Sequence, residues 1–169
     1  MDDCICYTIE TQAGFIPLAT NDSELLWMYL PVASYGEASR IISSECGNIS
    51  SEQYCRFADL DDLLISYFDS KPVDFSNVPV DLSYTTEFGR SVLTELRRVP
   101  YGCVVSYAEL AGNSARPGAA RAVGTVLGHN RTPLVLPCHR VIAANHKIGG
   151  FSAGLDWKYR LLNIEGVRI

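Results

Sequence analysis

Residues 71–81 separate two parts of the chain that differ in pattern and in charge. The segment contains Pro72 and Pro79 and follows neither the helical nor the strand period, so we interpret it as a linker. With 169 residues the chain can bury one sizeable core or two small ones, since domains typically hold about 100–150 residues. We therefore expect two domains, residues 1–79 and residues 80–169.

The net charges of the two parts are opposite. Residues 1–82 contain 3 basic and 14 acidic side chains, net −11, and residues 83–169 contain 11 basic and 5 acidic, net +6. Nucleic-acid affinity comes largely from cations that neutralise phosphates, so a basic region hints at a polyanionic partner. The hint is weak by itself, because the basic residues are scattered and uneven surface charge is common.

The first part is expected to be an α+β scaffold with a small antiparallel sheet. Alternating apolar and polar residues predict strands, and helix-like spacing predicts helices. We predict strands at residues 4–10, 15–20 and 24–30, and helices at residues 34–46 and 60–68.

The second part is expected to be mainly α-helical and to contain a helix-turn-helix. Its helices are predicted at residues 88–99, at 107–111, at about 118–127, and from Asp156, as the cap, to Gly166. The last of these has Trp157, Leu161 and Ile164 recurring on one side, and a short buried strand is predicted at residues 134–136.

The second helix of the helix-turn-helix has one face almost without side chains. Ala120, Gly124 and Gly128 lie on this face, with Arg121 as the charge among them. Small residues at this spacing either pack closely against another helix of the same protein or lie against a ligand. Arg121 favours the ligand slightly, because a lone arginine on an internal face would need a buried partner.

The six cysteines are expected to be free thiols. No apolar run approaches the roughly 20 residues needed to cross a bilayer and the N-terminus is acidic, so we expect the protein inside the cell, where thiols stay reduced. A zinc site would need an irregular grouping of Cys4 and Cys6 with Cys46 and Cys55, because no histidine precedes His129. We expect no metal.

Cys138 follows Pro137 directly, within the sequence PCHRV. A thiol is mostly protonated at neutral pH, so a nucleophilic cysteine needs a base, a cation or a helix N-terminus nearby. His139 and Arg140 are adjacent in sequence, but neighbours in an extended chain point to opposite faces. The residues alone leave two interpretations open, a nucleophile and a buried structural cysteine.

The chain resembles the O6-alkylguanine-DNA alkyltransferases, also called methylated-DNA–protein-cysteine methyltransferases. PCHRV is the active-site signature of that family. The segments VPYGCVVSYAELA, RAVG, GGFSAG and K-x-x-L-L-x-x-E match the family in order and spacing, as does Asn130. The resemblance covers about residues 57–166 well and the first part only in outline.

The resemblance implies roles in catalysis for four residues. Cys138 matches the acceptor that attacks the O6-alkyl carbon and keeps the alkyl group as a thioether. His139 matches the base that takes the thiol proton through a water, Glu165 the carboxylate that orients this histidine, and Asn130 the side chain that organises the turns around the site.

The resemblance also implies how the protein meets damaged DNA. The helix that carries Ala120, Gly124 and Gly128 is expected in the minor groove, with Arg121 filling the stack that the flipped nucleotide leaves. The expected pocket for the guanine is formed by Tyr107, which also helps to turn the nucleotide out, and by Val141, Phe151, Ser152 and Ala153.

Two departures from the family affect what is expected of this chain. Phe151 stands where many members have tyrosine, which keeps the stacking face and loses a hydroxyl. The histidines of the four-ligand zinc arrangement in some animal members have no counterparts here. We therefore expect a metal-free first part with a scaffold role, and no cofactor.

The implied function is single-turnover repair of double-stranded DNA by direct damage reversal. We expect a monomer that flips the damaged nucleotide and transfers the alkyl group of O6-alkylguanine irreversibly to Cys138, with O4-alkylthymine left open as a second substrate. The expected location is the nucleus in a eukaryote and the cytoplasm in a prokaryote, with no membrane association.

Three other functions compete with this interpretation. A damage-binding protein that signals without repair would lack the acceptor, whereas Cys138 is present. A helix-turn-helix regulator would present varied polar side chains to the major groove, whereas this helix offers alanine, glycine and one arginine. A cysteine hydrolase would turn over many substrates instead of being consumed.

Overall fold

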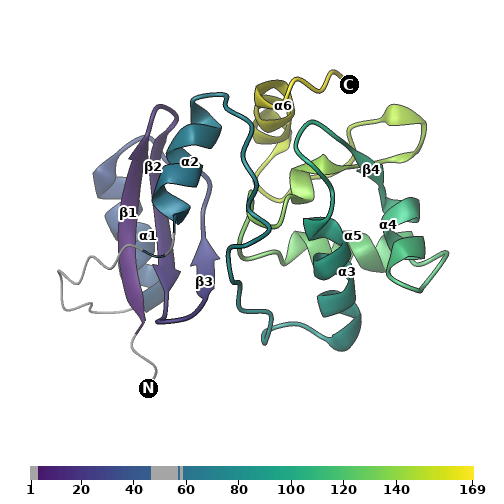
Figure 1. The fold of residues 1–169 in the computed structure, drawn as a ribbon, viewed down its shortest axis with the longest axis horizontal. Coiled ribbons are helices and arrows are strands. Elements are labelled where there is room, and N and C mark those ends of the chain that lie inside the picture. The colour runs from purple at the N-terminus through teal and green to yellow at the C-terminus, as the bar shows by residue number, and fades with distance from the viewer. Residues whose placement is uncertain (1–3, 47–56, 58) are drawn as a thin grey trace. The chain divides into compact units, whose positions relative to one another are not determined.

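The computed structural model describes residues 4–46, 57 and 59–169, which belong to two compact units. The first unit comprises Met1–Val73 with Asn77–Asp81, and the second comprises Asp74–Ser76 with Leu82–Ile169. The predicted fold class is confirmed: an antiparallel sheet with helices is followed by a mainly helical part with a helix-turn-helix (Figure 1).

The first unit is built on a three-stranded antiparallel sheet in the order β1-β2-β3. Its central strand has five consecutive buried residues, Ile16 to Thr20, so both of its faces need cover. Helix α1 contacts β1 and β2, and α2 contacts β1. The elements are β1 (Ile5–Thr11), β2 (Gly14–Thr20), β3 (Leu25–Met28), α1 (Tyr35–Cys46) and α2 (Leu60–Phe68), close to the predicted bounds.

The segment interpreted as a linker is partly paired with this sheet. The Leu25 amide donates to the Pro79 carbonyl at 2.9 Å, and the Asp81 amide donates to the Leu25 carbonyl at 3.0 Å. Residues 77–81 therefore extend the first unit. Their sequence shows no strand period, because the neighbouring strand and not an alternating pattern fixes their backbone.

The helices of the second unit form most of its core. Helix α3 buries Val92, Leu93 and Leu96, as its period predicts, and contacts α4 and α5. Within the described residues, no helix has the length and apolar character needed to cross a bilayer. The helices are α3 (Glu87–Arg97), α4 (Tyr107–Asn113), α5 (Ala120–Gly128) and α6 (Leu155–Ile164).

A two-stranded parallel sheet in the second unit is not predicted by the sequence. Strand β4 (Val105–Ser106) pairs with β5 (Val141–Ile142), directly after the PCHR segment. Ser106 also caps α4 through a capping box with Glu109. Strands of two residues are too short to show a period, yet this pairing fixes the start of α4 beside the cysteine segment.

The strand predicted at residues 134–136 is wrong. These residues are buried as expected, but Leu134 has φ 73° and the Leu136 amide donates to the Thr132 carbonyl at 2.9 Å. The chain therefore makes a turn here, which leads into η1 (Cys138–Arg140), a 3₁₀ helix. A run of apolar residues indicates burial, but it does not distinguish a buried turn from a buried strand.

Helix α6 begins and packs differently from the prediction. Its N-cap is Gly154, with φ 93°, and Asp156 lies in the first turn without capping it. The buried side is turned relative to the predicted apolar side, because Lys158 and Glu165 have hydrogen-bond partners inside the unit. The buried residues are Lys158, Leu161 and Leu162, followed by Glu165 as the C-cap, whereas the apolar pattern predicts Trp157, Leu161 and Ile164.

The prediction of free thiols fails for one pair of cysteines. Helix α1 crosses β1 and β2 and brings Cys46, its last residue, to Cys6 in β1, where the structure joins the two as a disulfide. Cys4, Cys103 and Cys138 are free thiols, and Cys55 lies outside the described residues.

The first unit yields a prediction about the turn between β1 and β2. Gly14 has φ 125°, and the Val32 carbonyl oxygen occupies the space of a side-chain Cβ. Gly14→Ala should lower the free energy of unfolding by at least about 1–3 kcal/mol, measured by urea denaturation. Gly36→Ala, at an open position in α1, is the control and should stabilise by up to about 1 kcal/mol. Equal effects would show that the turn tolerates a side chain.

Candidate active site

Cys138 is held at a fixed place by the backbone on both sides of it. Its amide donates to the Leu136 carbonyl at 2.8 Å, and the Arg140 amide donates to the Pro137 carbonyl at 2.9 Å. The residue is 5% exposed, so its thiol is almost entirely shielded from bulk solvent.

Asn130 connects the cysteine to the turn before it. Its Nδ2 donates to the Leu136 carbonyl at 2.8 Å and to Cys138 Sγ at 3.2 Å, while its Oδ1 accepts from the Thr132 amide at 3.1 Å. The amide group therefore shapes the turn and also offers the sulfur a donor. A donor at this place stabilises a thiolate more than a thiol.

The imidazole ring of His139 has a fixed orientation, because the buried carboxylate of Glu165 is hydrogen-bonded to it. His139 Nε2 and Glu165 Oε1 are 2.7 Å apart, and both side chains are fully buried. A carboxylate accepts hydrogen bonds, so the Nε2 atom carries the proton and Nδ1 is the ring nitrogen with a lone pair.

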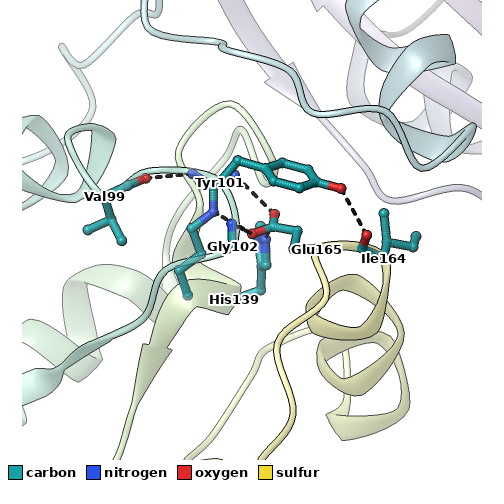
Figure 2. A network of polar contacts seen from close by, with 7 residues as sticks. Val99, Tyr101, Gly102, His139, Ile164 and Glu165 are labelled. Carbon is teal, nitrogen blue, oxygen red and sulfur yellow. Dashed lines mark hydrogen bonds and ion pairs between the residues drawn. The ribbon is translucent and has the colours of Figure 1, made fainter.

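Glu165 accepts hydrogen bonds from Gly102, His139 and, twice, from Arg140, and Figure 2 shows the network around its carboxylate. Arg140 binds both of its oxygens, from Nε at 2.9 Å and Nη2 at 3.0 Å, and the Gly102 amide donates at 3.0 Å. Arg140 Nη1 also donates to the Val99 carbonyl at 2.6 Å. A buried carboxylate with four donors and an arginine partner keeps its charge without leaving a polar atom unmatched.

These surroundings change the pKa values of the three groups in different ways. Burial raises the pKa of Cys138, although the hydrogen bond from Asn130 opposes this, and burial lowers the pKa of His139. Burial alone would raise the pKa of Glu165, but the hydrogen bonds from His139 and Arg140 lower it to about 2. At neutral pH the site therefore holds a neutral thiol, a neutral imidazole and a carboxylate.

Lys158 is a further site residue, which belongs to the K-x-x-L-L-x-x-E motif but has no role that the sequence indicates. Its Nζ is buried and donates to the Val141 carbonyl at 2.6 Å and the Gly150 carbonyl at 3.0 Å. Burial lowers its pKa to about 8, against the opposing influence of Cys138. The spacing of K-x-x-L-L-x-x-E was the available signal, since it places Lys158 and Glu165 on one helix face with two buried leucines.

The cysteine lies at the wall of a cavity of about 560 Å³. Tyr107 contributes to this wall, and its hydroxyl donates to the Gly150 carbonyl at 3.3 Å. Burial, together with the nearby Cys138, raises the pKa of Tyr107, so its phenol keeps its proton. The cavity brings together Cys138, Tyr107, Phe151, Ser152 and, from α5, Ala120, Arg121, Gly124 and Gly128.

Two residues of the predicted pocket lie elsewhere. Val141 is fully buried in β5 and meets the site through its carbonyl, which accepts from Lys158. Ala153 is exposed and does not line the cavity, although its neighbour Ser152 does. Arg121 is exposed at the start of α5, as a residue that reaches a large partner would be.

The arrangement can perform nucleophilic chemistry at one sulfur. It combines a thiol, an amide donor, a hydrogen-bonded imidazole–carboxylate pair and a cavity that admits a planar group. The second unit offers no cluster of three metal-ligating side chains in the part that the structure describes, and the one such group of the described residues lies in the first unit.

The comparisons with known proteins agree on one family. Residues 87–167 match the model of the DNA-binding domain of 6-O-methylguanine DNA methyltransferase. A methylated-DNA–protein-cysteine methyltransferase of Mycolicibacterium paratuberculosis is 37% identical over 158 residues, which are 94% of this chain and 90% of that protein. One of Methanopyrus kandleri is 46% identical over 101 residues, 59% of this chain and 73% of that protein.

Solved structures give the same result over nearly the whole chain. The O6-methylguanine methyltransferase of Mycobacterium tuberculosis has a TM-score of 0.76 and 34% identity, covering 96% of this chain and 93% of its own. A structure of the Mycobacterium tuberculosis OGT protein in complex with DNA has a TM-score of 0.74 and 32% identity, covering 95% and 92%.

The buried ion pair at Glu165 yields a prediction about stability. Glu165→Gln should lower the free energy of unfolding by about 3–5 kcal/mol, because it leaves the Arg140 charge buried without its counterion. Glu95→Gln is the control, since it breaks a surface pair with Arg98 and should change stability by at most about 1 kcal/mol. Denaturant titrations of the two variants measure this difference, and similar losses would contradict it.

Proposed function

The chain belongs to the methylated-DNA–protein-cysteine methyltransferase family, and we propose that Cys138 is the cysteine that receives the alkyl group. The protein repairs alkylated DNA by transferring the alkyl group to one of its own cysteines. The observation that carries the assignment to Cys138 is its position: its sulfur lies beside Asn130 at a cavity wall, and the next residue is hydrogen-bonded to Glu165.

In the proposed reaction the Cys138 sulfur attacks the carbon attached to guanine O6. A bond forms between sulfur and carbon while the bond between carbon and O6 breaks, so the alkyl group becomes a thioether. The electron pair of the broken bond stays on the guanine, which regains a proton and is left as ordinary guanine. No group in this scheme cleaves the thioether, so each chain reacts once.

His139 is the proposed acceptor of the thiol proton. Its Nε2 proton is directed at Glu165, so its Nδ1 lone pair is the basic position, and we propose that a water carries the proton from the sulfur. The imidazolium that forms is stabilised by the carboxylate at 2.7 Å. Lys158 supports the same step, since an ammonium near the sulfur favours the thiolate.

The departing guanine needs donors for the negative charge that develops on it. The backbone amides near Ser152 are proposed donors, and the Tyr107 hydroxyl becomes one when it turns away from the Gly150 carbonyl, its acceptor at 3.3 Å in this structure; both residues line the cavity. The raised pKa of Tyr107 keeps its hydroxyl protonated and therefore able to donate. The ring of Phe151, also at the cavity, offers a surface on which the guanine stacks.

A base inside a duplex cannot reach a buried thiol, so the alkylated nucleotide has to leave the stack. We propose that α5 lies in the minor groove, where the small residues Ala120, Gly124 and Gly128 allow a close approach, and that Arg121 fills the vacated place. The minor groove carries little sequence information, which suits a protein that repairs damage in any context.

The assembly and location follow from the same scheme. All proposed site residues belong to one chain and one compact unit, so a monomer is sufficient for repair. We propose that it acts where genomic DNA lies, in the nucleus of a eukaryote or the cytoplasm of a prokaryote.

The assignment of the acceptor is tested by mass spectrometry. After incubation with duplex DNA that contains O6-methylguanine, the peptide with Cys138 should gain one methyl group, and repair should stop at one equivalent per chain. Cys138→Ala should transfer nothing and still bind the DNA, because α5 is unchanged. Repaired DNA beyond one equivalent, or a methyl group on another cysteine, would overturn the proposal.

The role of Arg121 is tested by comparing two substrates. Arg121→Ala should slow repair of duplex DNA at least tenfold more than the reaction with free O6-benzylguanine, because only the duplex leaves a stack to be filled, at a few kcal/mol. Arg131→Ala, an exposed arginine stacked on Tyr84, is the control for loss of positive charge. Equal losses on both substrates would assign Arg121 to the chemistry or to the fold.

A further inference from the structure

Three cysteine sulfurs converge in the first unit, and none of the three cysteines has a proposed role in repair. The sulfurs of Cys4, Cys6 and Cys46 all lie within 4.8 Å of one another, and those of Cys4 and Cys6 are 3.6 Å apart. Cys4 directly precedes β1, Cys6 lies near the start of that strand, and Cys46 ends α1, at a sequence separation of 40 from Cys6. The fold and not the local sequence brings the three together.

We propose that Cys4, Cys6 and Cys46 bind a Zn²⁺ ion as thiolates, with the fourth coordination position open to solvent. A tetrahedral zinc ion with Zn–S bonds of about 2.3 Å holds its sulfur ligands about 3.8 Å apart. The separation of 3.6 Å between the Cys4 and Cys6 sulfurs is close to this value. Cys4 is exposed and the other two are half-buried, which leaves one side of the group open to water.

The structure joins Cys6 and Cys46 as a disulfide, so the proposed zinc site belongs to the reduced chain, in which both residues are thiols. Their Cα atoms are 7.4 Å apart, beyond the range of about 4.4–6.8 Å that disulfides usually span. A disulfide between Cys6 and Cys46 also gives no role to the Cys4 sulfur, which lies 3.6 Å from that of Cys6. Forming it removes two electrons and two protons and so needs an oxidant, whereas zinc only displaces the thiol protons.

The electrostatics around the three sulfurs favour a bound cation. Cys46 lies at the C-terminus of a helix of 12 residues, where the carbonyl groups carry partial negative charge, and no basic residue occupies the last turn. The nearby Glu45 is hydrogen-bonded to Tyr29 at 2.7 Å and adds negative charge.

This site differs from what the sequence analysis expects, which is a metal-free first part. It uses no histidine, and its third ligand comes from the end of a helix that the sequence places 40 residues away from Cys6. A zinc ion here would fasten α1 to β1, which is an edge strand of the sheet. The proposal does not depend on the repair activity, because no residue of the second unit takes part.

The test uses the full chain, stripped of metal by a chelator and kept reduced with a phosphine. Titration with Co²⁺ should give one ion per chain, with the d–d bands of a tetrahedral site and a thiolate charge-transfer band, and Zn²⁺ should displace it. Cys6→Ser and Cys46→Ser should each weaken Zn²⁺ binding at least tenfold. Cys103→Ser, which removes an exposed cysteine of the second unit, should leave it unchanged.

Two further measurements keep the proposal testable if a serine variant folds poorly. Cys46→His should still bind Co²⁺, with a weaker charge-transfer band because one thiolate is lost. Native mass spectrometry of the reduced chain should show one added zinc. A reduced chain that takes up no Co²⁺, or equal affinity in all the cysteine variants, would overturn the proposal.

Discussion

The carboxylate of Glu165 joins three segments that are distant in the sequence. Its four donors come from the cysteine segment through His139 and Arg140 and from the turn at Gly102, while Glu165 itself ends α6. A buried charge of this kind is tolerated only when every lone pair has a partner, so the segments can pack in one way. The orientation of the histidine next to Cys138 is a product of that requirement.

The same network sets the charges of the resting site. Hydrogen bonds from His139 and Arg140 keep Glu165 ionised, while burial, with a smaller contribution from the Arg140 charge, lowers the pKa of His139 and keeps its imidazole neutral beside a thiol that burial also keeps neutral. Charge separation between Cys138 and His139 is therefore unfavourable until a substrate occupies the cavity. Donors already in place, such as Asn130, then stabilise the new charge without rearranging.

The parts of this protein that could be predicted from sequence are those with a local period or a fixed motif. The three strands, the helices and the neighbourhood of Cys138 follow from such patterns. The failures depend on contacts between distant residues. From sequence alone, Lys158 is expected at the surface, because its acceptors, the carbonyls of Val141 and Gly150, are distant in the chain. The turn at Leu134 is predicted as a strand, because the apolar sequence indicates burial but not the backbone conformation.

The burial of Cys138 also affects how many chains remain able to react. A sulfur that is 5% exposed meets little bulk solvent, so the reagents that reach it are those that fit into the cavity. Thiol exchange cleaves a disulfide but not the carbon–sulfur bond of a thioether, so cellular thiols do not regenerate the reacted cysteine. Each chain is then consumed like a stoichiometric reagent. The number of alkyl groups that can be removed equals the number of unreacted chains, and only new protein synthesis increases it.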